Sequence, residues 1–460
     1  MPLFNVAPER VIDTLKKHVL VDGFHLVIDL DKSHGSWIHD AITGKEILDF
    51  YSYFASLPVG HNHPGLTGDP EFLAALQRAA LENPSNSDIY TSEYAAFVDT
   101  FGRIAMPPEF TYLFFVAGGA LAVENALKTA FDWKVRHNRA AGRGDKGTRI
   151  LHFREAFHGR SGYTLSLTNT DPVKTDMFPV FDWPRVINPR IEFPITPASL
   201  QRTVDREAQA VGEIRTAFAL HPHDIAAIII EPIQGEGGDH HFRAEFLQEL
   251  RRLADDNDAL LIFDEVQTGL GLTGRMWAWQ HFGVTPDIVA FGKKTQACGI
   301  MVGPRIDTVP DNVFHVSSRI NSTWGGNLVD MVRATRYLEI IEQQGLVENA
   351  ARMGARLLEG LDRMAMRHAT VSAVRGRGLM VAFSLATPEC RNALRQACWD
   401  RGLATLASGP RSIRFRPCLN VSAREIDLAL GILDEALQAV TGKQRSACAT
   451  PTTAQAPALV

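Results

Sequence analysis

Four short apolar runs stand out along the chain, and polar or glycine residues follow each of them at once. The runs are Tyr112–Val116, Ile225–Ile230, Ala259–Phe263 and Ile288–Phe291. Strands that are apolar on both faces are typical of a sheet covered by helices on each side. Stretches with helical periodicity alternate with these runs, which predicts an α/β fold with a mostly parallel central sheet. Ligands of such sheets bind beyond the carboxyl ends of the strands, so the residues after each run are candidates for a site.

The two ends of the chain show a different pattern from the middle. Residues 1–60 hold shorter alternating stretches, such as Leu26–Leu30, that predict a small sheet. A helical stretch begins at Met331, and a last helix is predicted near Ser422, which has the capping-box spacing to Glu425. The two ends therefore predict a small α+β lobe beside the large domain.

These patterns divide the chain into four predicted parts. The parts are an N-terminal segment of the small lobe (residues 1–60), a large domain (61–330), a C-terminal small domain (331–442) and a tail (443–460). The tail is rich in Ala, Thr, Pro and Ser and has no apolar periodicity, so we expect it to be disordered.

Composition and charge narrow the class of protein. Of the 460 residues 45% are hydrophobic and 22% are charged, which is typical of globular domains. The formal net charge of −5 gives no general attraction to nucleic acid or anionic lipid. No apolar run approaches the roughly 18 residues of a membrane span, and residues 1–10 do not resemble a signal peptide. The five cysteines form no CxxC pair, so the sequence indicates neither a disulfide framework nor a structural zinc site. We expect a cytoplasmic protein without nucleic-acid, membrane or metal partners.

A glycine pair follows the first apolar run. Gly118, Gly119 and Ala120 precede a predicted helix from Leu121 to Trp133. The free N–H groups at the start of a helix attract anions, so a phosphate group could rest there. A lone glycine pair at such a junction is more often a tight turn that allows close packing.

A carboxylate follows the third apolar run, and two lysines follow the fourth. Asp264 needs a partner, since an unpaired buried carboxylate is costly; a protonated pyridine nitrogen, a helix cap or an ion pair would serve. Lys293 or Lys294 could form an imine with an aldehyde cofactor, although adjacent surface lysines are more often solvated charge. The chemistry alone does not choose between the two lysines.

Two arginines and a histidine complete the candidates. Arg160 and Arg414 stand beside apolar residues, where a guanidinium can hold a substrate carboxylate through two hydrogen bonds. A structural ion pair is the commoner role for an arginine in such a place. We expect His158 to be structural, without a catalytic part.

Taken in order, several segments resemble the class III, or ω-amino-acid, aminotransferases, which are fold type I enzymes that use pyridoxal 5'-phosphate. The resemblance covers about residues 20–440. Its motifs are Gly118–Leu127, Phe157–Arg160, Glu231–Glu236, Asp264–Gln267, Phe291–Lys294, Thr323–Gly326 and Arg414–Pro417. Each motif is weak alone, but their ordered sum is specific.

The resemblance implies roles around the cofactor ring. Lys294 would be the Schiff-base lysine, because the second lysine keeps the family's spacing to the glycine that follows. Asp264 would pair with the pyridine nitrogen, and Gln267 would contact the phenolic oxygen. Phe157 and Val266 would cover the two ring faces.

The resemblance also implies a phosphate site shared between subunits. Gly119 and Ala120 would hold the phosphate, helped by Thr323 from the other subunit, so the active unit would be a homodimer. Many relatives place a hydroxyl residue near the glycine pair, whereas this chain has Ala117. Phosphate binding would then depend more on backbone N–H groups.

Within the class, three segments are most similar to the L-lysine 6-aminotransferase family: Glu231–Gly238, Gly292–Gln296 and Asn321–Leu328. This similarity implies a ping-pong transfer of the ε-amino group of L-lysine to 2-oxoglutarate. The products would be L-glutamate and 2-aminoadipate 6-semialdehyde, which cyclises to piperideine-6-carboxylate.

The same similarity implies a set of substrate-binding residues. Arg160 would receive the α-carboxylate of lysine, and Arg414 that of glutamate or 2-oxoglutarate, with Asn321 also among the substrate-binding residues. We hypothesise that Glu236 pairs with Arg414 in the lysine half-reaction and swings away when 2-oxoglutarate binds. The glycines at 237 and 238 would permit this movement.

Other functions remain open at this point. Another ω-aminotransferase would prefer 4-aminobutyrate, ornithine or an acylated diamine. A regulatory protein on an aminotransferase-like body would need a DNA-binding module, for which about 20 residues before the first matched segment leave no room. A dinucleotide-binding dehydrogenase would need a GxGxxG after the first strand, which is missing here.

Overall fold

The computed structural model describes residues 6–443, so the predicted tail lies outside the described residues apart from Lys443. The helices are α1 (Pro8–Leu15), α2 (Ser52–Ala55), α3 (Pro64–Thr67), α4 (Pro70–Leu81), α5 (Ser92–Ile104), α6 (Gly119–Ala140), α7 (Gly162–Leu167), α8 (Pro197–Leu220), α9 (Ala244–Asp256), α10 (Leu328–Gln343), α11 (Leu346–Arg367), α12 (Pro388–Asp400) and α13 (Ala423–Lys443). No helix in this part of the chain is both long and apolar enough to cross a membrane.

The strands form a large sheet and three smaller ones. They are β1 (Trp37–His39), β2 (Glu46–Asp49), β3 (Tyr112–Val116), β4 (Arg149–Phe153), β5 (Arg185–Val186), β6 (Ile225–Ile230), β7 (Ile233–Gln234), β8 (His240–His241), β9 (Leu260–Asp264), β10 (Ile288–Phe291), β11 (Cys298–Val302), β12 (Ser372–Arg377), β13 (Met380–Ser384), β14 (Leu403–Ala404), β15 (Leu406–Ser408) and β16 (Ser412–Phe415). The four apolar runs of the sequence thus become β3, β6, β9 and β10.

The large sheet has seven strands in the order β3-β11-β10-β9-β6-β4-β5. β11 runs antiparallel to both of its neighbours, and the other paired strands run parallel. The carboxyl ends of the parallel strands therefore meet at one edge of the sheet. This arrangement confirms the predicted α/β fold with a mostly parallel sheet.

Helices cover both faces of this sheet. Alternate residues of a strand point to opposite faces, and on β9 they fall into two separate apolar clusters. Leu260 and Ile262 belong to a cluster with Val123 of α6, whereas Leu261 belongs to a cluster with Leu250 of α9. Burial on both faces explains why these strands are continuous apolar runs in the sequence.

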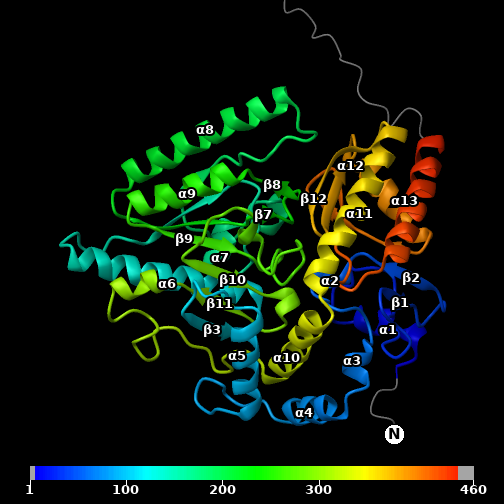
Figure 1. Ribbon diagram of the computed structural model, residues 1–460, viewed down its shortest axis with the longest axis horizontal. Coiled ribbons are helices and arrows are strands. Elements are labelled where there is room, and N and C mark those ends of the chain that lie inside the picture. Colours follow the sequence, from blue (N-terminus) through cyan, green and yellow to red (C-terminus); the bar gives the residue numbers. More distant parts are fainter. Residues whose placement is uncertain (1–5, 444–460) are drawn as a thin grey trace, which may run out of the picture.

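The ends of the chain come together in a smaller lobe. β14 pairs with β2 in a three-stranded sheet, so the N-terminal segment and the C-terminal segment share backbone hydrogen bonds. A four-stranded sheet, β12-β13-β16-β15, lies beside α11, α12 and α13 (Figure 1). The last helix starts at the predicted capping box, because the Glu425 carboxylate accepts from Ser422 N at 2.7 Å. The small α+β lobe is therefore confirmed, while the boundaries near residues 60 and 330 stay predictions.

Candidate active site

A cavity of about 370 Å³ lies beyond the carboxyl ends of the parallel strands. Segments that follow β3, β4, β6, β9 and β10 all contribute to its wall, as the strand topology requires. Its lining residues are Gly119, Ala120, Phe157, His158, Gly159, Arg160, Glu231, Glu236, Asp264, Val266, Gln267 and Lys293. Most of the residues named from the sequence thus meet here, whereas Lys294, Arg414, Thr323 and Asn321 are not part of this wall.

The glycine pair opens α6 at the edge of the cavity. Gly118 has a φ of +112°, a region that residues with a side chain rarely adopt, and no side chain caps the helix. A Cβ on Gly119 would lie 2.8 Å from Cγ1 of Val266, so this position needs glycine for close packing as well. The first N–H groups of a helix have no acceptor within it, so this end of α6 can hold an anion.

A buried carboxylate faces the cavity from the end of β9. Asp264 accepts hydrogen bonds from Nδ1 of His158 at 2.8 Å and from the N–H of Val266 at 3.0 Å. Both side chains are at most 5% exposed. His158, which was expected to be structural, therefore orients the Asp264 carboxylate. The sequence did not reveal this partner, although His158 stands beside Phe157 in one of the motifs.

The lysine in the cavity wall is Lys293. It has a φ of +54°, an unfavourable backbone conformation for a residue with a side chain. Burial and the nearby Arg414 lower the pKa of Lys293 to about 8, against the opposing effect of Asp264. A lysine with such a pKa supplies unprotonated amine near neutral pH.

Lys294 points to a different part of the molecule. Its Nζ donates to the carbonyl oxygen of Ala55 at 2.8 Å, and the side chain is 2% exposed. Ala55 ends α2, a short turn whose residues all have positive φ. Burial lowers the pKa of Lys294 to about 7. This position does not support the expected cofactor role of Lys294, since its side chain is directed at Ala55 while Lys293 lies in the cavity wall.

Glu231 supports the cavity wall from the end of β6. Its two carboxylate oxygens accept from the N–H groups of Phe157 and Gly235, both at 3.0 Å. Burial raises the pKa of Glu231 to about 7. The residue holds two wall segments together, one of which carries Phe157.

The two arginines differ in their surroundings. Arg160 is exposed at the cavity, with its guanidinium carbon 6.0 Å from the ring centre of Phe157. Arg414 is 3% exposed, and its Nη1 donates to Oε1 of Gln267 at 3.3 Å. Burial and the neighbouring Arg416 lower the pKa of Arg414 to about 10. Arg414 is thus a buried cation near the cavity, while Arg160 is a cation at its exposed edge.

Glu236 lines the cavity but does not pair with Arg414 in this structure. Its Oε1 forms an ion pair with Nζ of Lys174, a residue that the sequence analysis did not single out. Among the described residues, Oε2 of Glu236 and Nε of Arg414 are both buried without a hydrogen-bond partner. Arg414 donates to Oε1 of Gln267, and a Cβ on Gly235 would lie 2.3 Å from that same oxygen, so Arg414 and the segment that carries Glu236 meet at Gln267.

The glycines after Glu236 are packed tightly. A Cβ on Gly237 would lie 2.0 Å from the carbonyl oxygen of Glu155, and one on Gly238 would lie 2.3 Å from Nε2 of His240. These glycines therefore allow close packing, which differs from the hinge role expected from the sequence. Any movement of Glu236 has to come from its side chain.

Thr323 and Asn321 are exposed and do not line the cavity of their own chain. Their loop is held by Ser87, whose hydroxyl donates to the carbonyl oxygen of Ser322 at 2.7 Å, and by Asn86, whose N–H donates to the carbonyl oxygen of Trp324 at 3.2 Å. The loop is therefore ordered yet open to another molecule.

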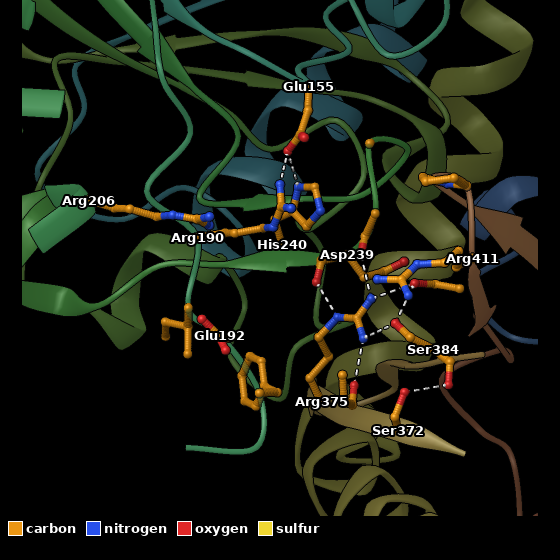
Figure 2. A pocket seen from close by; sticks show the side chains of 17 residues that line it. Glu155, Arg190, Glu192, Arg206, Asp239, His240, Ser372, Arg375, Ser384 and Arg411 are labelled. Carbon is orange, nitrogen blue, oxygen red and sulfur yellow. Dashed lines mark hydrogen bonds and ion pairs between the residues drawn. The ribbon is translucent and has the colours of Figure 1, made fainter. Parts of the chain in front are cut away.

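A larger cavity, of about 440 Å³, is lined by residues 237–239, which directly follow Glu236 of the smaller cavity (Figure 2). Arg375 lines this cavity and donates to the carbonyl oxygens of Gly238 and Asp239, at 2.6 and 2.8 Å. Glu155 accepts from Arg190 and lies 3.3 Å from Nδ1 of His240. Because these charges pair with one another and none of the predicted site residues lines it, this cavity is not the candidate active site.

The smaller cavity fits pyridoxal 5'-phosphate. The uncapped start of α6 suits the phosphate, and the Asp264 carboxylate suits a protonated ring nitrogen. Lys293 offers an amine for the aldehyde, and Phe157 and Val266 line the same wall. No group of three His, Cys, Asp or Glu side chains that could hold a metal occurs in residues 6–443.

Comparisons with known proteins agree with this chemistry. The family model of the class III aminotransferases matches residues 20–437. The L-lysine-epsilon aminotransferase of Mycobacterium tuberculosis is 54% identical over 436 residues, which cover 94% of this chain and 96% of that protein. The corresponding enzyme of Streptomyces clavuligerus is 50% identical over 439 residues, or 95% of this chain and 96% of that protein. A solved structure of the lysine aminotransferase from M. tuberculosis matches with a TM-score of 0.93 and 54% identity, covering 95% of this chain and 100% of that one. This chain therefore belongs to the class III aminotransferases, which use pyridoxal 5'-phosphate.

Proposed function

We propose that the protein is an L-lysine 6-aminotransferase. It transfers the ε-amino group of L-lysine to 2-oxoglutarate and yields 2-aminoadipate 6-semialdehyde, which cyclises to piperideine-6-carboxylate, and L-glutamate. Similarity over nearly the whole chain to relatives of that name supports this substrate pair. The structural observation that carries the proposal is the cavity carboxylate Glu236, on a segment that meets the buried Arg414 at Gln267. A carboxylate side chain that can pair with the arginine or move away from it allows one site to accept lysine and 2-oxoglutarate in turn.

Lys293 is the residue that we assign to hold the cofactor and to move the proton at the substrate carbon. When bound, pyridoxal 5'-phosphate supplies an aldehyde that takes up amino groups and a ring that draws electrons from the adjacent carbon. The lowered pKa of Lys293 suits both tasks near neutral pH. Asp264 keeps the ring nitrogen protonated, and His158 holds the Asp264 carboxylate in place.

Two arginines receive the substrate carboxylates. Lysine presents its ε-amino group at Lys293, so its α-carboxylate lies at the far end of a four-carbon chain and suits the exposed Arg160. 2-Oxoglutarate carries a carboxylate directly beside its reacting carbon, and Arg414 is close enough to Lys293 to lower its pKa. Arg414 is therefore the receptor for the acceptor's α-carboxylate, through a two-point pair.

We also propose that the active unit is a homodimer in the cytoplasm. The exposed loop of Thr323 carries Trp324, a large apolar side chain that is 45% exposed in one chain. A second copy would bring Thr323 to the phosphate and Asn321 to the substrate. Mixing the variants Lys293→Ala and Thr323→Ala tests this, because mixed dimers contain one intact site and should regain activity. Unchanged inactivity of proven mixed dimers would exclude a shared site.

Isotope-labelled lysine tests the reaction itself. Purified holoenzyme with 2-oxoglutarate should transfer nitrogen-15 from the ε position of lysine into glutamate, and lysine labelled at the α position should transfer none. Piperideine-6-carboxylate should appear in equal amount. A panel with ornithine, 4-aminobutyrate and an acylated diamine is the matched control, and clear preference for any of these donors would contradict the assignment of lysine.

A further inference from the structure

Lys174 lies beside the active-site cavity, at the end of a short 3-10 helix, Pro172–Lys174, and contacts a residue of the cavity wall. Its side chain is 11% exposed, and its Nζ pairs with Oε1 of Glu236 and donates to Oγ1 of Thr170 at 2.8 Å. The same Nζ lies 5.6 Å from the ring centre of Phe157, a residue of the cavity wall. An ammonium group is thus held beside the cavity with its charge directed at Glu236.

Glu236 therefore has two cations within its surroundings and contacts one of them. It pairs with Lys174, while its second oxygen has no hydrogen-bond partner among the described residues. Arg414 keeps an unpartnered Nε in the same part of the structure. In this arrangement Glu236 does not pair with the guanidinium of Arg414, and 2-oxoglutarate requires this separation if its carboxylate is to take that place.

The backbone beneath Glu236 is anchored, so a change of partner involves the side chain. Gly409 N donates to the carbonyl oxygen of Glu236 at 3.0 Å, and Ser408 Oγ donates to that of Gly235 at 2.7 Å. On the other side, Arg375 holds the carbonyl oxygens of Gly238 and Asp239 (Figure 2). A glutamate side chain on a rigid backbone can exchange between two nearby cations by rotating its own bonds.

We propose that Lys174 is a positioning residue that holds Glu236 away from Arg414 while the acceptor binds. The proposal rests on the function proposed above and adds a second resting place for the Glu236 carboxylate. Without Lys174, the carboxylate would turn to Arg414 and compete with the α-carboxylate of 2-oxoglutarate. With lysine in the site, Glu236 leaves Lys174 and neutralises Arg414. Lys174 thereby sets the balance between the two substrate-binding states.

Dicarboxylate binding to the holoenzyme tests this proposal. Glutarate matches 2-oxoglutarate but lacks the keto group, so calorimetry measures its affinity without any turnover. Lys174→Met should weaken glutarate binding about tenfold, the factor expected when the competent state falls to a tenth of the population. The KM for 2-oxoglutarate should rise by the same factor at an unchanged kcat. Lys174→Arg should restore both values, and Lys45→Met, at an exposed lysine, serves as the matched control.

Repeating the measurement in a Glu236→Gln variant distinguishes the positioning role of Lys174 from a general structural role. In Glu236→Gln, no carboxylate remains to compete for Arg414, so adding Lys174→Met should leave glutarate affinity unchanged. An equal loss of affinity with and without Glu236 would overturn the proposal, and so would an unchanged affinity in Lys174→Met alone. If Lys174→Met folds poorly, Thr170→Val removes the hydrogen bond to Nζ, keeps the charge and should weaken glutarate binding in the same direction. These outcomes do not depend on the amino donor, whereas failure of lysine to form product would count against the proposed function alone.

Discussion

Two cavities meet at the segment Glu236–Asp239 and hold different groups: Glu236 lines the smaller one, and residues 237–239 line the larger one. In the larger cavity, Arg375 donates to backbone and hydroxyl oxygens through all three of its nitrogens, and Glu155 pairs with basic neighbours. Each cavity also has one buried carboxylate oxygen without a partner among the described residues, on Glu236 in the smaller and on Asp239 in the larger, so unpaired oxygens do not distinguish the two. Of the two, only the smaller cavity combines an uncapped helix start with a buried carboxylate and a lysine of lowered pKa. Chemistry, and not volume, therefore distinguishes the active site.

The largest expected effect is at the lysine in the smaller cavity. Lys293→Ala should abolish covalent cofactor attachment and reduce turnover by at least about 10⁴-fold, the upper range for loss of a general base. Lys294→Ala should retain the attached cofactor, because Lys294 contacts Ala55. Borohydride reduction followed by mass spectrometry of the labelled peptide checks both variants. If the attached cofactor survives in Lys293→Ala and is lost in Lys294→Ala, then Lys294 is the Schiff-base lysine, as the sequence resemblance implied.

Asp264→Asn should slow the lysine half-reaction by about 10² to 10³-fold, the range for loss of one preorganised charge partner. The neutral side chain no longer keeps the ring nitrogen protonated, so the ring is a weaker electron sink. Single-turnover absorbance gives the rate, and near-normal rates would mean that another group holds the proton. Lys45→Met, at an exposed lysine, serves as the control and should leave this rate unchanged.

Glu236 and Arg414 should affect different half-reactions. Glu236→Ala should impair the lysine half-reaction more, because Arg414 is then left buried without an anion. Arg414→Ala should impair the 2-oxoglutarate half-reaction more, by about 10 to 100-fold for a lost charged hydrogen-bond pair of 1.5–3 kcal/mol. Rapid-mixing absorbance, recorded for each half-reaction separately, measures the split. If both variants slow both half-reactions equally, then Glu236 does not exchange on and off Arg414 between the two half-reactions.

A substitution in the larger cavity should change the stability of the protein and leave substrate binding unaffected. Arg375→Met leaves the buried carbonyl oxygens of Gly238 and Asp239 without donors, which should lower the free energy of unfolding by about 3 kcal/mol. The KM values for lysine and 2-oxoglutarate should stay unchanged, since no substrate group enters this cavity and the N–H of Gly409 still holds the carbonyl oxygen of Glu236. Thermal unfolding and steady-state kinetics on the same sample give both results. A substrate-specific loss with normal stability would show that the two cavities are functionally joined.

The smallest expected effect concerns pH. The pKa of Lys293 is lowered from its ordinary 10.5 to about 8, so half of the amine is unprotonated near pH 8 and the unprotonated fraction continues to rise above that pH before it levels off. Cofactor uptake by the apoprotein should follow this curve. Arg414→Met should move it to higher pH, because a nearby positive charge that disfavours the charged lysine is removed. Uptake rates measured by absorbance between pH 6 and about 10 would show the shift; a curve that does not move would mean that Arg414 has no influence on Lys293.

The sequence alone determined the strands that build the site. The continuous apolar runs identify β3, β6, β9 and β10, because strands buried on both faces tolerate few polar residues. It did not reveal β4 or β11, in which Arg149 and the small residues Cys298 and Gly299 weaken the apolar signal. The capping box of α13 was also readable, because it depends on residues three positions apart.

Tertiary structure decided the contacts between residues that are distant in the chain. The adjacent lysines look alike in sequence, yet the positive φ of Lys293 turns one toward Asp264 and leaves the other against Ala55. From the sequence, Gly237 was expected to permit movement of Glu236, but in the structure the carbonyl oxygen of Glu155 packs against it. Lys174 carried no local signal, because its partner Glu236 stands 62 positions away. Periodicity reports which side of an element is buried, whereas the partner that a buried charge meets depends on how the whole chain folds.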